Sequence, residues 1–126
     1  MVEVSDVVTP QQVERRLIQL AKELDAAHQE NVAAEKQYFD AKANYEIKIA
    51  KARLQVGQRY AERGVKATVQ DREDEALMVA QEDLMALYNA EAEVKAVRAN
   101  VARIRSQIDI TRSISANVRN SMEVLV

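Results

Sequence analysis

Apolar residues recur along the first half of the chain at alternating intervals of four and three positions. The series begins at Val13 and continues to Tyr45, and such spacing keeps its members on one stripe of an α-helix. Beyond Tyr45 the intervals lengthen toward an eleven-residue repeat. The pattern predicts one long helix that packs on a partner helix through a single seam. Its members are Val13, Leu17, Leu20, Leu24, Ala27, Asn31, Ala34, Tyr38, Ala41 and Tyr45, then Ile49, Ala52, Val56 and Tyr60.

Local residues mark both ends of this helix. Thr9 is a suitable N-cap, Pro10 suits the first helical position, and Gln12 completes a capping box. Gly64 suits the left-handed position that follows a helix, and Arg63 lies in the preceding turn, where the helix dipole favours a cation. We therefore predict a first helix over about residues 10–63.

A second helix is predicted over about residues 69–122. Thr68 is a second N-cap with Asp71 three residues later, so the turn between the helices covers about residues 64–68. The apolar stripe of the second helix then runs, again at intervals of three and four, through Leu77, Ala80, Leu84, Leu87, Ala90, Val94, Val97, Val101, Ile104 and Ile108.

A short turn between two long helices requires them to pack antiparallel, so that residue i faces roughly residue 132 − i. Charge agrees with this register, because the basic stretch 41–66 would face the acidic stretch 71–93, while the more acidic start of the chain would face a basic stretch from Lys95 to Arg119. We predict an all-α fold: a long two-helix antiparallel coiled-coil hairpin that forms one domain over residues 1–126.

A second apolar row follows the first helix beside the seam. A two-helix hairpin cannot bury this row, and burial of each large apolar side chain contributes about 1.5–3 kcal/mol. We therefore predict that the hairpin is a protomer of a helical oligomer, or binds a partner, through Ile18, Val32, Phe39, Ile47 and Leu54.

The amino-acid composition limits the kinds of catalytic and metal-binding site that the chain could form. The 126 residues include two glycines, one proline, one histidine, and no cysteine or tryptophan. A disulfide framework, a thiolate zinc site and a cysteine nucleophile are therefore excluded. His28 has no second histidine or cysteine to complete a zinc site, so a solvated helix-face histidine is the favoured interpretation. We expect no enzyme activity, no cofactor, no metal and no small-molecule substrate.

The start of the chain has acidic residues where a signal peptide would have basic ones, and no apolar run is long enough for a membrane span. We expect no membrane association and a location in the cytoplasm of a host cell, with association with the virion as the alternative.

The segment Lys51-Ala52-Arg53-Leu54, followed by Tyr60 and Arg63-Gly64, carries a family resemblance, together with the spaced isoleucines and arginines from Ile104 to Arg112. In these features the chain resembles the small helical recombination mediator proteins of T4-type bacteriophages, and more generally the small proteins of tailed phages. The resemblance implies a ring-forming oligomer that binds single-stranded DNA without sequence preference. By position it implies phosphate contacts from Lys48, Lys51, Arg53, Arg59, Arg63 and Lys66.

Three functions follow as hypotheses. The first is a phage accessory protein that oligomerises, binds single-stranded DNA and works with recombination or replication proteins; the basic stretch 42–66, interleaved with Tyr45 and Tyr60, favours it. The second is a structural, scaffold or adaptor coiled coil with no nucleic-acid binding, which the second apolar row favours. The third is a chaperone-like or inhibitory helical hairpin that binds a partner through its second apolar row. The net charge of −2 and the acidic stretch 71–93 count against the first.

Overall fold

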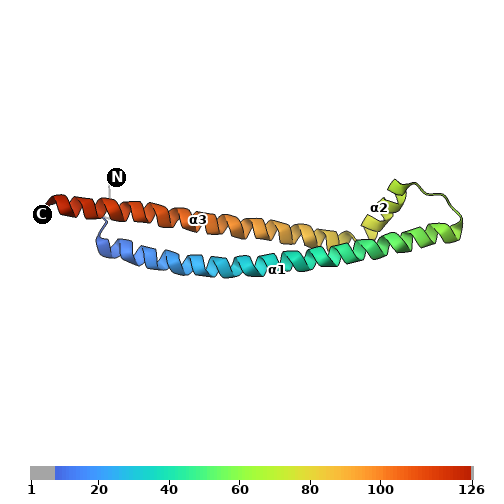
Figure 1. Cartoon of the computed structure of the whole chain (residues 1–126), viewed down its shortest axis with the longest axis horizontal. Coiled ribbons are helices and arrows are strands. Elements are labelled where there is room, and N and C mark those ends of the chain that lie inside the picture. Colours follow the sequence, from blue (N-terminus) through green and yellow to red (C-terminus); the bar gives the residue numbers. More distant parts are fainter. Residues whose placement is uncertain (1–7, 126) are drawn as a thin grey trace, which may run out of the picture. The chain divides into compact units, whose positions relative to one another are not determined.

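A computed structural model describes residues 8–125 of the chain, with side chains described as far as residue 122. The described residues form three α-helices and no strand: α1 (Pro10–Arg63), α2 (Val69–Val79) and α3 (Gln81–Leu125) (Figure 1). The all-α prediction is confirmed.

The N-terminus of α1 carries the predicted capping box. The Thr9 backbone amide donates to Gln12 Oε1 at 3.0 Å, and the Gln12 amide donates to Thr9 Oγ1 at 3.2 Å. These two bonds satisfy amides that the first helical turn leaves without intrahelical partners. The helix therefore begins at Pro10, as the sequence predicts.

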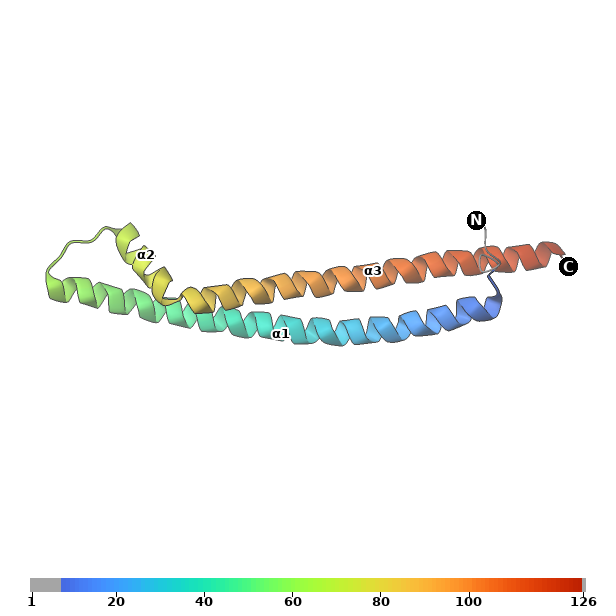
Figure 2. The same ribbon diagram turned by 180° about the vertical axis from the view of Figure 1, so that it is seen from behind.

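The connection between α1 and α2 also follows the local prediction. Gly64 has a φ of +64°, which a glycine adopts without steric cost, and its amide bonds to the Ala61 carbonyl oxygen at 3.2 Å. Thr68 then caps α2 by accepting a bond from the Asp71 amide at 3.0 Å. Figures 1 and 2 show the connecting loop leaving the end of α1 and α2 returning at an incline toward it.

The second helix is interrupted at Ala80, so the prediction of one continuous helix from residue 69 is wrong. Ala80 has φ −94° and ψ 11°, outside the helical range, although its amide still bonds to the Ala76 carbonyl oxygen at 3.1 Å. Near this point the seam of α1 takes successive steps of four, whereas the seam of the later helices takes two successive steps of three, through Leu84, Leu87 and Ala90. Two helices with different periods stay in contact only if one of them bends.

Contacts divide the chain into two compact units, and α1 contributes to both. One unit comprises residues 1–31 and 96–126, here called the terminal unit, and the other comprises residues 32–95, the central unit. The terminal unit buries an aliphatic cluster of Leu20, Ala27, Val101 and Ile104, against which Leu24 and Ile108 also pack. Arg16 of α1 donates to Gln107 Oε1 of α3 at 3.0 Å beside this cluster.

The central unit has a core of smaller side chains. Ile49, Ala52 and Val56 of α1 pack with Ala76 of α2 and with Ala80 between the helices. Three partly buried residues, Tyr45, Tyr60 and Leu77, close the cluster. Both Ala76 and Ala80 are fully buried, which places α2 against α1 through methyl groups.

Candidate interaction surfaces

The six basic residues of the predicted DNA site all lie in the central unit and are all exposed: Lys48, Lys51, Arg53, Arg59, Arg63 and Lys66. They do not share one face of α1. At about 100° per residue, Lys48 and Arg59 lie within about 20° of each other, whereas Arg53 lies about 140° from Lys48. Arg53 is therefore separated from Lys48 and Arg59 around the helix.

Arg53 is bound by an acid of α2. Its Nη2 lies 2.6 Å from Glu73 Oε1, and its Nε donates to both oxygens of the same carboxylate at 3.1 and 3.2 Å. The hydrogen bonds and charge of Glu73 raise the pKa of the Arg53 guanidinium. The Arg53 guanidinium therefore already has an ionic partner within the chain. The other five basic side chains make no salt bridge with a described residue.

A second polar contact joins α1 to α2 farther along. The Tyr60 hydroxyl donates to Glu75 Oε1, and this bond together with partial burial raises the pKa of the Tyr60 phenol. Beside it lies an open hollow of about 350 Å³ under the loop, lined by Gly57, Tyr60, Lys66 and Arg72 among others. A Cβ at Gly57 would meet nothing within 4 Å, so no close approach of a neighbouring group requires a glycine at this position.

The five apolar residues of the predicted interface are all exposed. Ile18 lies in the terminal unit and is 52% exposed. The other four lie on α1 in the central unit, and Leu54 is 69% exposed. These four, Val32, Phe39, Ile47 and Leu54, fall within about 80° on the helix and point away from the core residues. They are here called the α1 outer row.

A second outer row, which sequence reasoning missed, lies on α2 and α3 of the central unit. Met78, Met85 and Tyr88 are 73%, 53% and 57% exposed. The interval of seven between the two methionines could have revealed it, but the buried leucines and alanines of the seam dominate that stretch. Both outer rows belong to one unit, so the central unit exposes apolar surface on both of its sides.

The histidine and the acidic residues within 71–75 were the remaining candidates for a metal or ion site. No set of three or more His, Asp or Glu side chains among residues 8–122 could hold a metal ion. His28 is half-buried and lines a hollow between α1 and α3 of the terminal unit. Two acids near the start of α2 take part in local bonds of that helix. The Asp71 backbone amide donates to the Thr68 cap, and the Asp74 carboxylate accepts a bond from the Gln70 side chain at 2.7 Å. None of the described helices has an apolar stretch long enough to cross a bilayer.

Comparison with known proteins leaves the family open. No protein-family model matches the chain, and searches of curated proteins and of solved structures found no matching protein.

Proposed function

We propose that the protein is a non-enzymatic assembly protein whose copies pack side by side through the two outer rows of the central unit. The observation that carries this proposal is the pair of exposed apolar rows, one on α1 and one on α2 and α3. A helix that is apolar on two sides is suited to a position between two neighbouring helices. The α1 outer row of one copy would then meet the α2–α3 outer row of the next.

Charge supports this pairing of unlike rows. Around the α1 outer row, the exposed cations Lys36 and Lys51 accompany the exposed acids Asp40 and Glu46, whereas Asp74, Glu82 and Glu93 are exposed on α2 and α3. Contact between two α2–α3 outer rows would oppose like charges, whereas contact between unlike rows brings Lys36 and Lys51 toward those acids. A head-to-tail interface of this kind continues until it closes into a ring or extends into a filament.

Within this proposal each protomer is a continuous antiparallel hairpin. In the terminal unit Leu17 shares a hollow with Ser115, and Asn31 shares another with Val101. In the central unit Val56 and Ala76 occupy one cluster. Each of these pairs follows the register in which residue i faces about residue 132 − i, which supports the same antiparallel register within each unit.

Introducing negative charge into one apolar row at a time tests the assembly. Phe39→Glu with Leu54→Glu blocks the α1 outer row, and Met78→Glu with Met85→Glu blocks the other row. Light scattering should show a large oligomer for the unaltered protein and a monomer for each double variant. Gln37→Glu with Gln55→Glu adds the same charge to exposed positions of α1 away from its outer row, and it should leave the mass unchanged.

A mixture of the two blocked variants gives the sharpest result. Each variant retains one intact row, so the mixture should form a dimer although neither variant associates alone. If the methionine variant still dimerises by itself, the α1 rows pair with each other and the head-to-tail arrangement is wrong. A stable monomer of the unaltered protein at micromolar concentration would overturn the proposal.

Binding of single-stranded DNA is a second candidate function, in the setting of phage recombination or replication that the resemblance implies. The five exposed cations without a salt bridge favour it, and Tyr60 lies among them. Retardation of a labelled oligonucleotide should weaken steeply with salt and with Lys51→Glu plus Arg59→Glu. Absence of retardation at low salt would exclude this candidate and leave the assembly role intact.

A further inference from the structure

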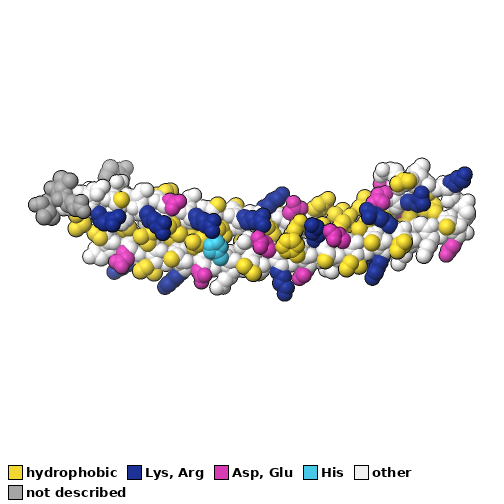
Figure 3. All heavy atoms as spheres, viewed as in Figure 1, with side chains coloured by type: hydrophobic (Ala, Val, Ile, Leu, Met, Phe, Trp, Pro, Cys, Tyr) yellow, Lys and Arg dark blue, Asp and Glu magenta, His cyan; other side chains and the backbone are white. Residues whose placement is uncertain are grey.

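Arginine recurs at every seventh position along α3 in the terminal unit. The four residues are Arg98, Arg105, Arg112 and Arg119, here called the arginine row, and all four are exposed. Each one directly follows a seam residue, so the row runs along one flank of the seam. Successive arginines are about 10.5 Å apart at 1.5 Å per residue. Figure 3 shows dark-blue side chains at regular intervals along α3, with the single histidine beside them.

The facing flank of α1 places an acid beside only part of this row. Arg119 shares a hollow with Glu14, and Arg105 shares one with His28. The same seven-residue step places Ala21 opposite Arg112. A coiled coil usually pairs flanking charges with opposite ones, yet the middle of this row faces an alanine and a histidine.

Three members of the row, Arg105, Arg112 and Arg119, form no salt bridge along the described part of their own helix. Asp109 lies one turn from both Arg105 and Arg112, but no salt bridge joins them. Within residues 8–122, Arg105, Arg112 and Arg119 form no salt bridge at all. Three guanidinium groups at regular spacing therefore face solvent with their charge uncompensated.

Two hollows lie beside the row, and one of them has mainly apolar walls. One, of about 250 Å³, has Val13, Leu17 and Val118 in its wall and Arg119 at its margin. The other, also about 250 Å³, has His28 and Asn31 in its wall as well as Val101 and Ala102, and its margin is formed by Arg98 and Arg105. Apolar recesses bordered by cations suit the apolar and acidic side chains of an amphipathic helix.

We propose that this flank of the terminal unit binds an amphipathic α-helix of another protein, with acidic side chains at seven-residue intervals. Such a helix presents carboxylates about 10.5 Å apart, the spacing of the arginine row, and bidentate pairing with guanidinium groups would set its register. The interaction is separate from the assembly through the central unit, since it uses different residues on a different part of the chain.

The alternatives fit this flank less well. Single-stranded nucleic acid is generally held by aromatic stacking as well as charge, and residues 1–31 and 96–126 contain no Phe, Trp or Tyr. A second copy of the chain does not supply the acidic helix either, because no three Asp or Glu residues of the sequence recur at intervals of seven. The occupant is therefore a different protein.

Two synthetic helical peptides test the proposal. One has glutamates at every seventh position and leucines beside them, and the other has the same composition with glutamates at every fifth position. Fluorescence anisotropy with the full-length protein should show the first peptide binding about tenfold more tightly than the second. Arg105→Glu with Arg112→Glu should abolish that difference.

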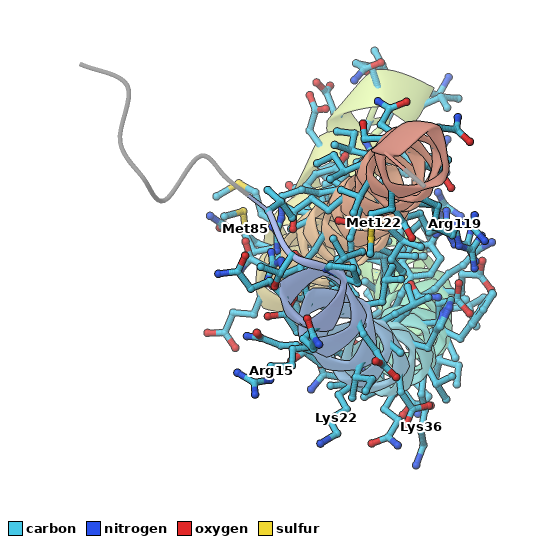
Figure 4. All side chains as sticks on the ribbon, turned by 90° about the vertical axis from the view of Figure 1, so that its left-hand side faces the viewer. Arg15, Lys22, Lys36, Met85, Arg119 and Met122 are labelled. Carbon is cyan, nitrogen blue, oxygen red and sulfur yellow. The ribbon has the colours of Figure 1, made fainter. Side chains whose placement is uncertain are left out.

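A matched control uses Arg15→Glu with Lys22→Glu, which reverses two charges that are also seven residues apart. These side chains extend from α1 on a different side from Arg119 (Figure 4), so this variant should keep the peptide preference. Circular dichroism checks the helix content of both variants. Where charge reversal lowers the helix content, Arg105→Gln with Arg112→Gln replaces it, and the preference should again disappear.

Other outcomes overturn the proposal. These are equal affinity for the two peptides, binding of neither, or an equal loss in the Arg15 and Lys22 control. A thymidine oligonucleotide of about 20 nucleotides serves as competitor. If the oligonucleotide binds and the Arg105 and Arg112 variant loses that binding without any peptide preference in the unaltered protein, the row is a nucleic-acid site instead.

Discussion

The terminal and central units both pack segments of α1 against later helices, but they fill their seams differently. The terminal unit relies on branched aliphatic side chains, with Leu20 and Ile104 almost wholly buried. The central unit places Ala52, Ala76 and Ala80 at the contact and adds bonds from Arg53 and Tyr60 to acids of α2. Large aliphatic groups remove more apolar area from water than methyl groups do.

Their outer surfaces differ as well. The central unit exposes apolar rows on two sides and contains all five aromatic residues of the chain, whereas the terminal unit has no aromatic residue and carries the arginine row. The comparison indicates a division of roles within one chain. The central unit, whose seam contains small alanine side chains, has the surfaces suited to assembly. The terminal unit, whose seam contains larger aliphatic side chains, has a charged surface suited to a partner helix.

The largest expected effect is the loss of an aliphatic core residue in the terminal unit. Leu20→Ala should lower the free energy of unfolding by about 2–5 kcal/mol, because it removes buried methylene groups and leaves a cavity. Hydrogen exchange should accelerate mainly in residues 10–31 and 96–122. Leu54→Ala, at an exposed position, should change monomer stability by less than about 0.5 kcal/mol. Equal acceleration in both units would contradict the comparison.

A larger side chain in the alanine seam should affect the central unit instead. Ala80→Leu should destabilise it by about 1–3 kcal/mol, since a fully buried alanine leaves no room for an isobutyl group. Ala86→Leu, at an exposed position of the same unit, is the control. Urea unfolding of both variants measures the difference, and a neutral Ala80→Leu would show that the seam is loosely packed.

The two N-caps allow a matched test of local stability. Thr68→Ala removes the cap of α2 and Thr9→Ala removes that of α1, and each should cost about 1 kcal/mol. Site-resolved hydrogen exchange should show faster opening of residues 69–79 in the first variant and of the start of α1 in the second. Exchange that spreads through the other unit in either variant would mean that the two units open together.

The smallest effect concerns pH. The bond to Glu75 raises the pKa of Tyr60 above its usual value near 10, so its contribution to stability is complete below that value and is lost as pH rises through the raised pKa. Urea unfolding at about pH 9 and about pH 11 should show a smaller loss in Tyr60→Phe than in the unaltered protein. Tyr38→Phe is a suitable control. An identical pH dependence in Tyr60→Phe would show that the bond to Glu75 contributes nothing measurable.

Features set by neighbouring residues were predictable. Thr9 with Gln12, Gly64, and Thr68 with Asp71 mark the helix ends, and the structure forms each of those local bonds or the expected positive φ. The exposure of the α1 outer row also followed from its spacing. Its part in an interface stays a prediction, as do the DNA contacts and the phage setting.

Features that depend on distant residues were not predictable in the same way. Nothing in the residues around Ala80 marks a helix interruption, since neither glycine nor proline is near. Basic residues that form one group along the sequence lie on different faces of α1, and only the position of Glu73 shows that Arg53 is bound within the chain.

The sequence by itself determined an all-α fold, the ends of α1, the start of α2 and the seam positions, because caps and apolar intervals act within a few residues. Only the tertiary structure decided where the second predicted helix is interrupted and which basic residue of α1 forms a salt bridge with an acid of α2. It also decided which arginines of α3 form no salt bridge. Those outcomes depend on which side chains of separate helices meet, and the spacing along a single helix does not specify that.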